Sequence, residues 1–452
     1  MWNTRTAAWC TLATLTMIQT SVPAAETAPS GETREQRDAR MAWWREARFG
    51  MFIHWGPVSL KGTEISWSRA NSNPKCPNKG KVPVEVYDNL YKDFNPTKFD
   101  AAEWVGIAKD AGMKYVVLTA KHCDGFLLWH SQASDYSMAA TPFKRDICAE
   151  LAKAVRKQDL RLGWYFSPMD WRDPDFRTER NAAFLGRMQA EIRELLSNYG
   201  RIDLMWFDHD GREALYDQPH VYALVKKLQP EIVINNRLDL STGDDNRKML
   251  SPCADYYTPE QKLGGYDDQR PWETCMTLGR QWAWKPNDTI KSVSEVVAIL
   301  AKCVGGNGNL LLNVGPMPDG RIEPRQVEVL KGVGEWMKRN GESIYGTCGG
   351  PFKPGDFGSS TRRGDTIYLH VLKWSGDTLA LPALPKKVVG SALLTGGEVK
   401  VEQTATALRV TVAPQARQES DTVVRLRIDG SAMEIAPIGT EVVKPKEKGD
   451  RK

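Results

Sequence analysis

The 452-residue sequence predicts an α/β protein, built from a (β/α)8-type barrel followed by a C-terminal antiparallel β-sandwich. Short apolar runs alternate with segments of helical spacing about eight times over the first 350 residues, a pattern that indicates a parallel sheet. After residue 350 the helical spacing disappears and short alternating segments follow one another, as in a sandwich. The length also exceeds one ordinary core, which favours a large domain plus a smaller one.

The first five predicted strands are apolar runs that stop at polar residues or glycine. Residues 49–56 (FGMFIHWG), for example, are mostly apolar and end at a glycine. We expect these strands at 49–56, 115–119, 160–166, 202–207 and 232–235. The segments before and between these strands have apolar residues at helical spacing, as at Trp104, Val105 and Ala108. We expect these helices at 32–46, 100–112, 146–158, 181–199 and 220–228.

The remaining elements are less regular. We expect weaker strands at 254–258 and 272–276, a helix at 292–304, a strand at 309–314 and a last helix at 326–340. Glycine-containing turns then separate the predicted strands of the sandwich, at 366–374, 388–394, 407–412 and 422–428. A doubly wound open sheet is the alternative for the first part, but no GxGxxG follows an early strand.

The N-terminus resembles a secretory signal. Arg5 precedes an apolar stretch at 7–18, and small residues follow up to Ala25, so cleavage is expected after Ala24 or Ala25. The apolar stretch is shorter than the ~20 residues that span a bilayer, and no later segment qualifies. We therefore expect an exported protein, periplasmic or extracellular, without a membrane span. The expected organisation is a signal peptide at 1–25, a barrel at 26–349, a sandwich at 350–435 and a basic, disordered tail at 436–452.

The composition limits the kinds of partner that can be expected. A net charge of +5 is small for this length, and no nucleic-acid motif accompanies the scattered basic residues, so we expect no nucleic-acid partner. Sixteen tryptophans offer flat apolar faces for sugar rings, although many tryptophans are simply core residues. Removal of the signal leaves an odd number of cysteines and no CxxC pair to suggest zinc or a redox motif. We expect neither a metal nor a cofactor. One or two disulfides are compatible with export, and no feature of the sequence indicates an oligomeric state.

Polar residues close several of the predicted strands. His54, His122, Asp208, Arg237 and Glu260 all occupy such positions. Since the carboxyl ends of barrel strands share one face, these side chains are expected to converge there.

The central candidate is Asp208, in the segment 204–211 (LMWFDHDG). An unpaired acid at the end of a buried strand costs several kcal/mol or shifts its pKa, and catalysis is the usual reason for one. Retaining glycosidases use two carboxyl groups ~5–5.5 Å apart, one of which attacks the anomeric carbon. We therefore interpret Asp208 as the nucleophile, with Glu260, after Thr258 and Pro259, as the acid/base. Glu273 is the alternative acid/base, and an ion pair at the barrel rim is the structural alternative for any of the three.

Other side chains suit a sugar ligand. His54 and His122 can donate hydrogen bonds to hydroxyls, and Arg237 can bind hydroxyls or keep the nucleophile ionised. Trp67, Trp206 and Trp284 are candidate sugar platforms, although Trp206 could equally be core. A metal site on the two histidines lacks the HExxH type of spacing. The candidate substrate-binding residues are therefore His54, His122, Arg237, Trp67, Trp206 and Trp284.

Five motifs taken together resemble the α-L-fucosidases of glycoside hydrolase family 29. They are FGMFIHWG at 49–56, KHCDGF at 121–126, LMWFD at 204–208, WETCMT at 272–277 and NGNLLLNVGP at 307–316. The resemblance implies a retaining exo-hydrolase with a barrel and a C-terminal β-sandwich, acting on fucosylated oligosaccharides or glycoconjugates. It implies that Asp208 is the nucleophile and favours Glu260 as the acid/base.

The resemblance also assigns residues to the sugar. It implies that His54, His122, Trp206 and Arg237 hold the fucose, with Tyr165, Glu64 and Trp67 beside it. The family often has two adjacent histidines before Asp-Gly-Phe, whereas this chain has Cys123 after His122, which puts its preference among ring hydroxyls in doubt.

Two alternatives stay open at this level. The missing second histidine is compatible with a barrel that binds carbohydrate without cleaving it. A fucose-like sugar such as α-L-galactose differs by one hydroxyl, which an apolar pocket rejects only by about a hundredfold.

Overall fold

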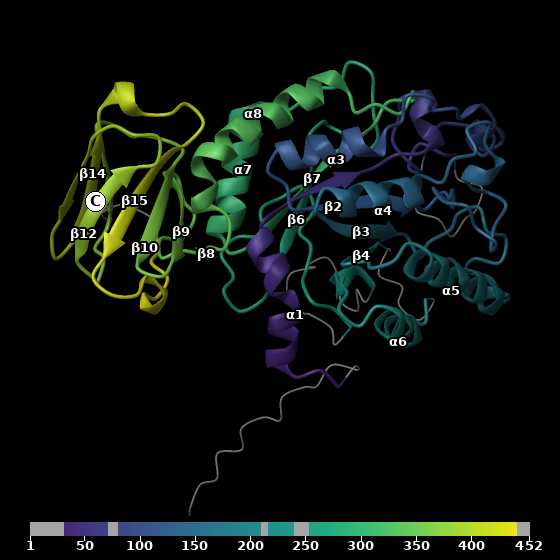
Figure 1. Ribbon diagram of the computed structural model, residues 1–452, viewed down its shortest axis with the longest axis horizontal. Helices are drawn as coiled ribbons and strands as arrows, with labels where there is room; N and C mark the ends of the chain where they lie inside the picture. The colour runs from purple at the N-terminus through teal and green to yellow at the C-terminus, as the bar shows by residue number, and fades with distance from the viewer. Residues whose placement is uncertain (1–30, 71–79, 209–215, 239–252, 441–452) are drawn as a thin grey trace, which may run out of the picture.

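A computed structural model describes residues 31–70, 80–208, 216–238 and 253–440 of the protein (Figure 1). The predicted signal peptide and residues 441–452 of the predicted tail lie outside the described residues. Within the described ranges, no helix is both long enough and apolar enough to cross a membrane. The six cysteines described are all free thiols, and five of them are buried.

The predicted parallel sheet is confirmed. Seven strands form one curled sheet in the order β5-β4-β3-β2-β1-β7-β6. The strands are β1 (Phe49–Ile53), β2 (Tyr115–Lys121), β3 (Arg161–Phe166), β4 (Leu204–Phe207), β5 (Val233–Ile234), β6 (Glu273–Thr277) and β7 (Asn309–Val314). β1 is an interior strand, parallel to β2 on one side and to β7 on the other. Almost every strand residue is buried, because the barrel interior covers one face and helices cover the other.

The expected strand at 254–258 differs from the prediction. This part of the chain forms only isolated parallel bridges, from Tyr256 to the end of β5 and from Tyr257 to Trp272 before β6. Pro259 contributes to this irregularity because it has no N–H to donate to a ladder. Its carbonyl still accepts the backbone N–H of Cys275 at 3.1 Å. The segment 254–261 therefore joins the two edges of the seven-stranded sheet and closes the barrel.

Seven of the described helices lie close to their predicted positions, and the short helix α2 was not predicted. They are α1 (Arg34–Ala47), α2 (Val84–Tyr87), α3 (Ala101–Asp110), α4 (Ile147–Lys157), α5 (Asn181–Ser197), α6 (Gln218–Leu228), α7 (Val293–Gly305) and α8 (Pro324–Asn340). Side-chain caps fix several starts: Asp100 accepts two backbone N–H groups at the start of α3, and Ser292 forms a capping box with Glu295 at the start of α7.

The C-terminal part consists of antiparallel sheets, as predicted. A five-stranded sheet has the order β12-β15-β10-β9-β8, and a three-stranded sheet has the order β11-β14-β13. The strands are β8 (Cys348–Gly349), β9 (Gly358–Arg363), β10 (Thr366–Val371), β11 (Thr378–Pro382), β12 (Val388–Leu393), β13 (Val399–Gln403), β14 (Ala407–Val412) and β15 (Thr422–Ile428). Figure 1 shows α7 and α8 between these sheets and the barrel strands.

Four of these strands, β8, β9, β11 and β13, were not predicted. β9 reads GSSTRR and lacks an apolar run, so it carries no strand pattern of its own. It is nonetheless buried against α7, where Ser359 Oγ donates to the carbonyl of Ala301 at 2.7 Å. Tertiary packing therefore decides this strand.

A buried ion pair holds the irregular segment to the barrel. Arg40 of α1 binds both carboxylate oxygens of Asp255, at 2.9 and 2.7 Å, and the same carboxylate accepts the N–H of Ile234 at 2.9 Å. Burial raises the pKa of Asp255, but Arg40, Arg37 and the N–H of Ile234 together lower it by more, so its net pKa lies below the usual value.

We expect Asp255→Asn to lower the free energy of unfolding by about 1.5–3 kcal/mol near neutral pH, because the buried Arg40 loses one of its two anionic partners and keeps Glu32. A lowered pKa in the folded state contributes stability above the unfolded value of about 3.9, and this contribution is lost as the pH falls below it. The difference between variant and wild type should therefore shrink below about pH 4, as urea unfolding at several pH values would show.

Asp38→Asn is the matched control. Asp38 pairs with Arg45 at 2.6 Å, but its side chain is 44% exposed. Its loss should cost at most about 1 kcal/mol. Equal losses for the two variants would contradict the assigned role of Asp255.

Candidate active site

A cavity of about 230 Å³ opens at the carboxyl ends of the barrel strands. Eight of the predicted site residues line it: His54, Trp67, His122, Tyr165, Trp206, Asp208, Arg237 and Glu260. Five further residues complete the lining: Phe52, Cys123, Met169, Cys275 and Trp282. The expected convergence of strand-end side chains is therefore observed.

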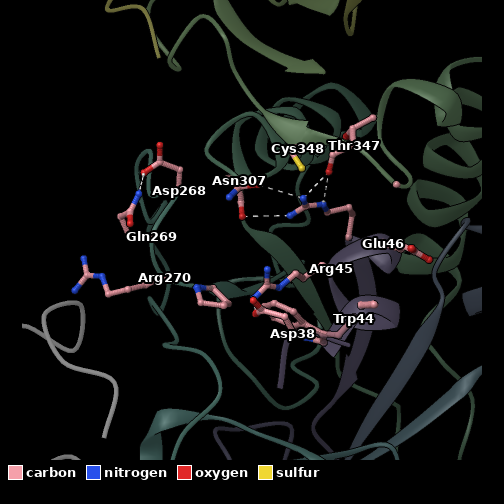
Figure 2. A pocket seen from close by; sticks show the side chains of 14 residues that line it. Asp38, Trp44, Arg45, Glu46, Asp268, Gln269, Arg270, Asn307, Thr347 and Cys348 are labelled. Atoms are coloured by element: carbon pink, nitrogen blue, oxygen red, sulfur yellow. Dashed lines mark hydrogen bonds and ion pairs between the residues drawn. The ribbon is translucent and has the colours of Figure 1, made fainter. Parts of the chain in front are cut away.

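A second cavity, of about 370 Å³, lies at the opposite end of the strands (Figure 2). Its wall includes Arg48, which precedes β1, and Asn307, which precedes β7. Arg48 donates to the carbonyl of Thr347 and to the side chain of Asn307, so its guanidinium is occupied by structural contacts. Because barrel enzymes carry their chemistry at the carboxyl ends of the strands, the first cavity is the candidate active site.

One guanidinium holds both candidate carboxylates. Arg237 Nη1 lies 2.9 Å from Asp208 Oδ1, and Nη2 lies 2.8 Å from Glu260 Oε2. Thr258 fixes the same guanidinium, because its hydroxyl accepts from Arg237 Nε at 2.8 Å. Burial opposes the charge on Arg237, yet the two acids raise its pKa well above the usual value. The two carboxyl groups are thus held side by side at the cavity wall.

The second oxygen of Asp208 is also bound. The Tyr165 hydroxyl donates to Oδ2 at 2.9 Å. Burial, and then the charge of Asp208, raise the pKa of Tyr165 well above its usual value, so the phenol keeps the proton that it donates. With Arg237 on one oxygen and Tyr165 on the other, the carboxylate has a fixed orientation.

Aromatic rings stack beneath this arrangement. His122 stacks on Tyr165 with ring centroids 5.3 Å apart, and Tyr165 stacks on Trp206 at 5.5 Å. The guanidinium of Arg237 then lies 4.7 Å from the Trp206 ring. These residues come from successive strands, and the strand spacing of about 4.8 Å sets the spacing of the rings. Sheet geometry therefore aligns the four side chains in one row.

Both cavity histidines are neutral. Burial lowers the pKa of His122 to about 3, and burial together with His122 lowers that of His54 well below its usual value. His54 Nδ1 lies 2.6 Å from Asn313 Oδ1, while the amide nitrogen of Asn313 donates to the carbonyl of Trp282. This assigns the proton to Nδ1 and leaves Nε2 of His54 as an acceptor. His122 Nδ1 lies 2.6 Å from Ser66 Oγ.

Three predicted site residues do not line the cavity. Glu64 accepts the backbone N–H groups of Ile65, Trp282 and Ala283 at 3.0, 2.9 and 3.1 Å. Burial raises its pKa, against these donors, which lower it. Trp284 stands outside the cavity, whereas Trp282 lines it. Glu273 is fully buried in the barrel interior, below the cavity.

Some of the cavity residues that were not predicted could have been found from the alternation of side chains along a strand. Phe52 on β1 precedes His54, the residue directly after the strand, by two positions, so period-two alternation places both on the same face. The same alternation places Cys275 on the face of Glu273. Trp282 lies in a loop after β6, where no period applies. Nothing local distinguishes it from Trp284.

In the described ranges, no group of three or more His, Cys, Asp or Glu side chains is arranged to hold a metal ion.

Comparisons with known proteins agree on one family. A sequence model of α-L-fucosidase matches residues 16–342 of the chain. The plasma α-L-fucosidase of Homo sapiens is 32% identical over 397 residues, which cover 79% of this chain and 82% of the relative. The structure of α-L-fucosidase isoenzyme 1 from Paenibacillus thiaminolyticus has a TM-score of 0.79 at 33% identity, covering 87% of this chain and 99% of that chain.

A further structural neighbour bears on mechanism. A family 29 α-L-fucosidase from Bacteroides thetaiotaomicron has been trapped as a covalent intermediate with 2-fluoro-fucosyl fluoride. It has a TM-score of 0.76 at 29% identity, and the match covers 87% of this chain and 97% of that chain. A covalent intermediate is a property of retaining glycosidases.

The hydrogen bonds to the Glu64 carboxylate should make the backbone at Trp282 and Ala283 rigid. We expect Glu64→Ala to speed amide hydrogen exchange at Trp282 and Ala283 by about tenfold or more, because each amide loses a hydrogen bond to a carboxylate. Hydrogen-exchange mass spectrometry on the peptide that contains both residues would measure it. Glu85→Ala removes an exposed glutamate and should leave that peptide unchanged. Exchange that is equally slow in both variants would refute the role of Glu64.

Proposed function

The chain belongs to the α-L-fucosidases of glycoside hydrolase family 29, and on that premise we propose that it hydrolyses terminal α-L-fucosyl residues of glycans with retention of configuration. One observation carries the assignment of roles. Arg237 holds Asp208 and Glu260 side by side in a cavity at the carboxyl ends of the strands. Two carboxyl groups at one cavity wall are what double displacement at an anomeric carbon requires.

In the proposed mechanism Asp208 is the nucleophile. Its carboxylate attacks the anomeric carbon, while Glu260, in its protonated form, gives its proton to the departing glycosidic oxygen. Glu260 then takes a proton from a water molecule, which attacks the fucosyl ester and releases Asp208. The contacts of Arg237 and Tyr165 support the attacking role, because they orient the carboxylate before reaction. Glu260, whose side chain is 42% exposed, has access to the leaving group and to water.

The position of Glu273 supports the choice of Glu260 as the acid/base. Glu273 is fully buried and does not line the cavity, so its carboxyl group cannot approach a glycosidic oxygen there. Glu260, by contrast, shares the Arg237 guanidinium with Asp208.

The proposed fucose site combines polar and apolar groups. The neutral imidazoles of His54 and His122 can each exchange hydrogen bonds with sugar hydroxyls. Phe52, Trp206 and Trp282 offer apolar surface to the ring and its methyl group. At about 230 Å³ the cavity is smaller than most drug-sized pockets, so it suits one terminal sugar and an exo-acting enzyme. Trp67, 42% exposed, lies where the rest of the glycan would leave.

The roles are tested by hydrolysis of 4-nitrophenyl α-L-fucoside with residues 26–452. We expect Asp208→Gly and Glu260→Ala each to lower kcat by about 10³-fold or more, because each removes one half of the double displacement. Azide should rescue both, with different products. Glu260→Ala should give the α-fucosyl azide after two displacements, and Asp208→Gly the β-fucosyl azide after one.

The azide products assign the carboxylates independently of the size of the rate loss. Rescue with the opposite anomers would exchange the two roles. A wild-type protein that cleaves only the α-L-galactoside would refute the choice of fucose, and one that binds fucose without cleaving either substrate would refute catalysis.

Export is part of the proposal and rests on the signal-like segment at 1–25. Sequencing of the protein from its native host should show a mature N-terminus at Ala25 or Glu26, in the periplasm or the medium. Deletion of residues 2–25 should retain the protein in the cytoplasm. A full-length chain that stays in the cytoplasm would contradict export.

A further inference from the structure

A carboxyl group is buried in the barrel interior without a cationic partner. Glu273 is fully buried, and in the described part of the chain no lysine or arginine pairs with it. Instead, aromatic donors surround its oxygens. Trp44 Nε1 donates at 3.2 Å, the Tyr115 hydroxyl at 2.5 Å and Trp206 Nε1 at 3.3 Å. Such a group is costly to bury, so its position calls for an explanation.

The hydrogen bond to Trp206 connects this carboxyl group to the active site. The Trp206 ring lies under the guanidinium of Arg237 and stacks on Tyr165. Arg237 and Tyr165 are the two side chains that hold the oxygens of Asp208. The indole of Trp206 is therefore a shared support for both contacts, and Glu273 fixes the edge of that indole from below.

We propose that Glu273 is a positioning residue of the hydrolysis, whose ionised carboxylate fixes the Trp206 indole and through it the grip of Arg237 and Tyr165 on Asp208. This inference rests on the proposed function of Asp208. Glu273 touches neither the sugar nor the reacting atoms, because it does not line the cavity. Its effect on the reaction is geometric and electrostatic.

The charge of Glu273 determines how strongly it acts. A carboxylate accepts a stronger hydrogen bond from the indole N–H than a carboxylic acid does. Negative charge at the indole edge also strengthens the attraction between the ring and the Arg237 guanidinium. The ionised form of Glu273 is therefore the form that holds Trp206 and Arg237 firmly.

The neighbours of Glu273 allow this charge to change near neutral pH. Burial raises the pKa of Glu273 to about 7, against the aromatic donors, which lower it. Three other titratable groups face it: Tyr115 on β2, Tyr256 in the segment 254–261 and Cys275 on its own strand. Burial raises the pKa of each of them well above its usual value, so all three stay neutral.

The test compares wild type with Glu273→Gln, which keeps the shape of the side chain and removes its titration. We measure kcat/KM on 4-nitrophenyl α-L-fucoside between about pH 5 and 9, on either side of the expected transition. The ratio of wild type to variant should rise by about tenfold as the pH passes through 7, because only the wild type gains the charge. A purely structural role would give a ratio that is independent of pH.

Two further variants complete the test. Tyr115→Phe removes a donor that favours ionised Glu273, so its kcat/KM should reach a plateau at a higher pH than that of wild type. This variant decides the question even if Glu273→Gln fails to fold. Asp421→Asn is the control, because it replaces another fully buried carboxyl group, one that binds His370 in the C-terminal sheets. Its ratio to wild type should not change with pH.

The outcomes separate the two proposals. A wild-type enzyme that is active, with a constant ratio for Glu273→Gln and an unshifted profile for Tyr115→Phe, overturns the role of Glu273 alone. A wild-type protein without activity at any pH overturns the proposed function and this inference together.

Discussion

The active site depends on the burial of one cation between two acids. Arg237 is 6% exposed, and a guanidinium at such a depth is tolerable only with anionic partners and satisfied donors. Asp208 and Glu260 provide the charge, and Thr258 accepts a further hydrogen bond. Conversely, the cation offsets the repulsion between the two carboxylates. Each charge is therefore a condition for the others, and the surrounding strands are arranged to meet it.

The barrel meets this condition by combining regular and irregular backbone. Regular strand spacing brings Tyr165 and Trp206 into register, so that the first can bind Asp208 and the second can support Arg237. The irregular segment 254–261 supplies Thr258 and Glu260, whose positions a continuous ladder would not provide. The departure from regular strand structure thus coincides with the place where the second carboxylate is needed. Backbone irregularity next to an active site is common for this reason.

Much of this could be predicted from the sequence, and the limits have a physical cause. Strand ends and helices are local patterns, so the barrel and the positions of His54, His122 and Asp208 followed from apolar runs and their termini. The positions of side chains that depend on contacts distant in the sequence could not be predicted in this way. Trp284 is predicted in the cavity, but Trp282 lines it instead. The loop that carries Trp282 is held by the Glu64 carboxylate, which is more than two hundred residues away in the sequence, so no local pattern could indicate this. Strand β9 was missed because helix α7 buries residues that are not apolar.

The four candidate acids illustrate why residue type is a weak guide to role. The carboxyl group of Glu64 accepts hydrogen bonds from backbone N–H groups and that of Glu273 from aromatic donors, whereas Asp208 and Glu260 share a guanidinium at an open cavity. The first two environments are closed to a substrate, and the third is not. Asp208, Glu260 and Glu273 were plausible in the sequence because each lies in or next to a predicted strand, whereas Glu64 entered only through the resemblance to the family. The donors around each carboxyl group distinguish the acids that can react from the acids that have a structural or positioning role. These donors come from elements far apart in the chain.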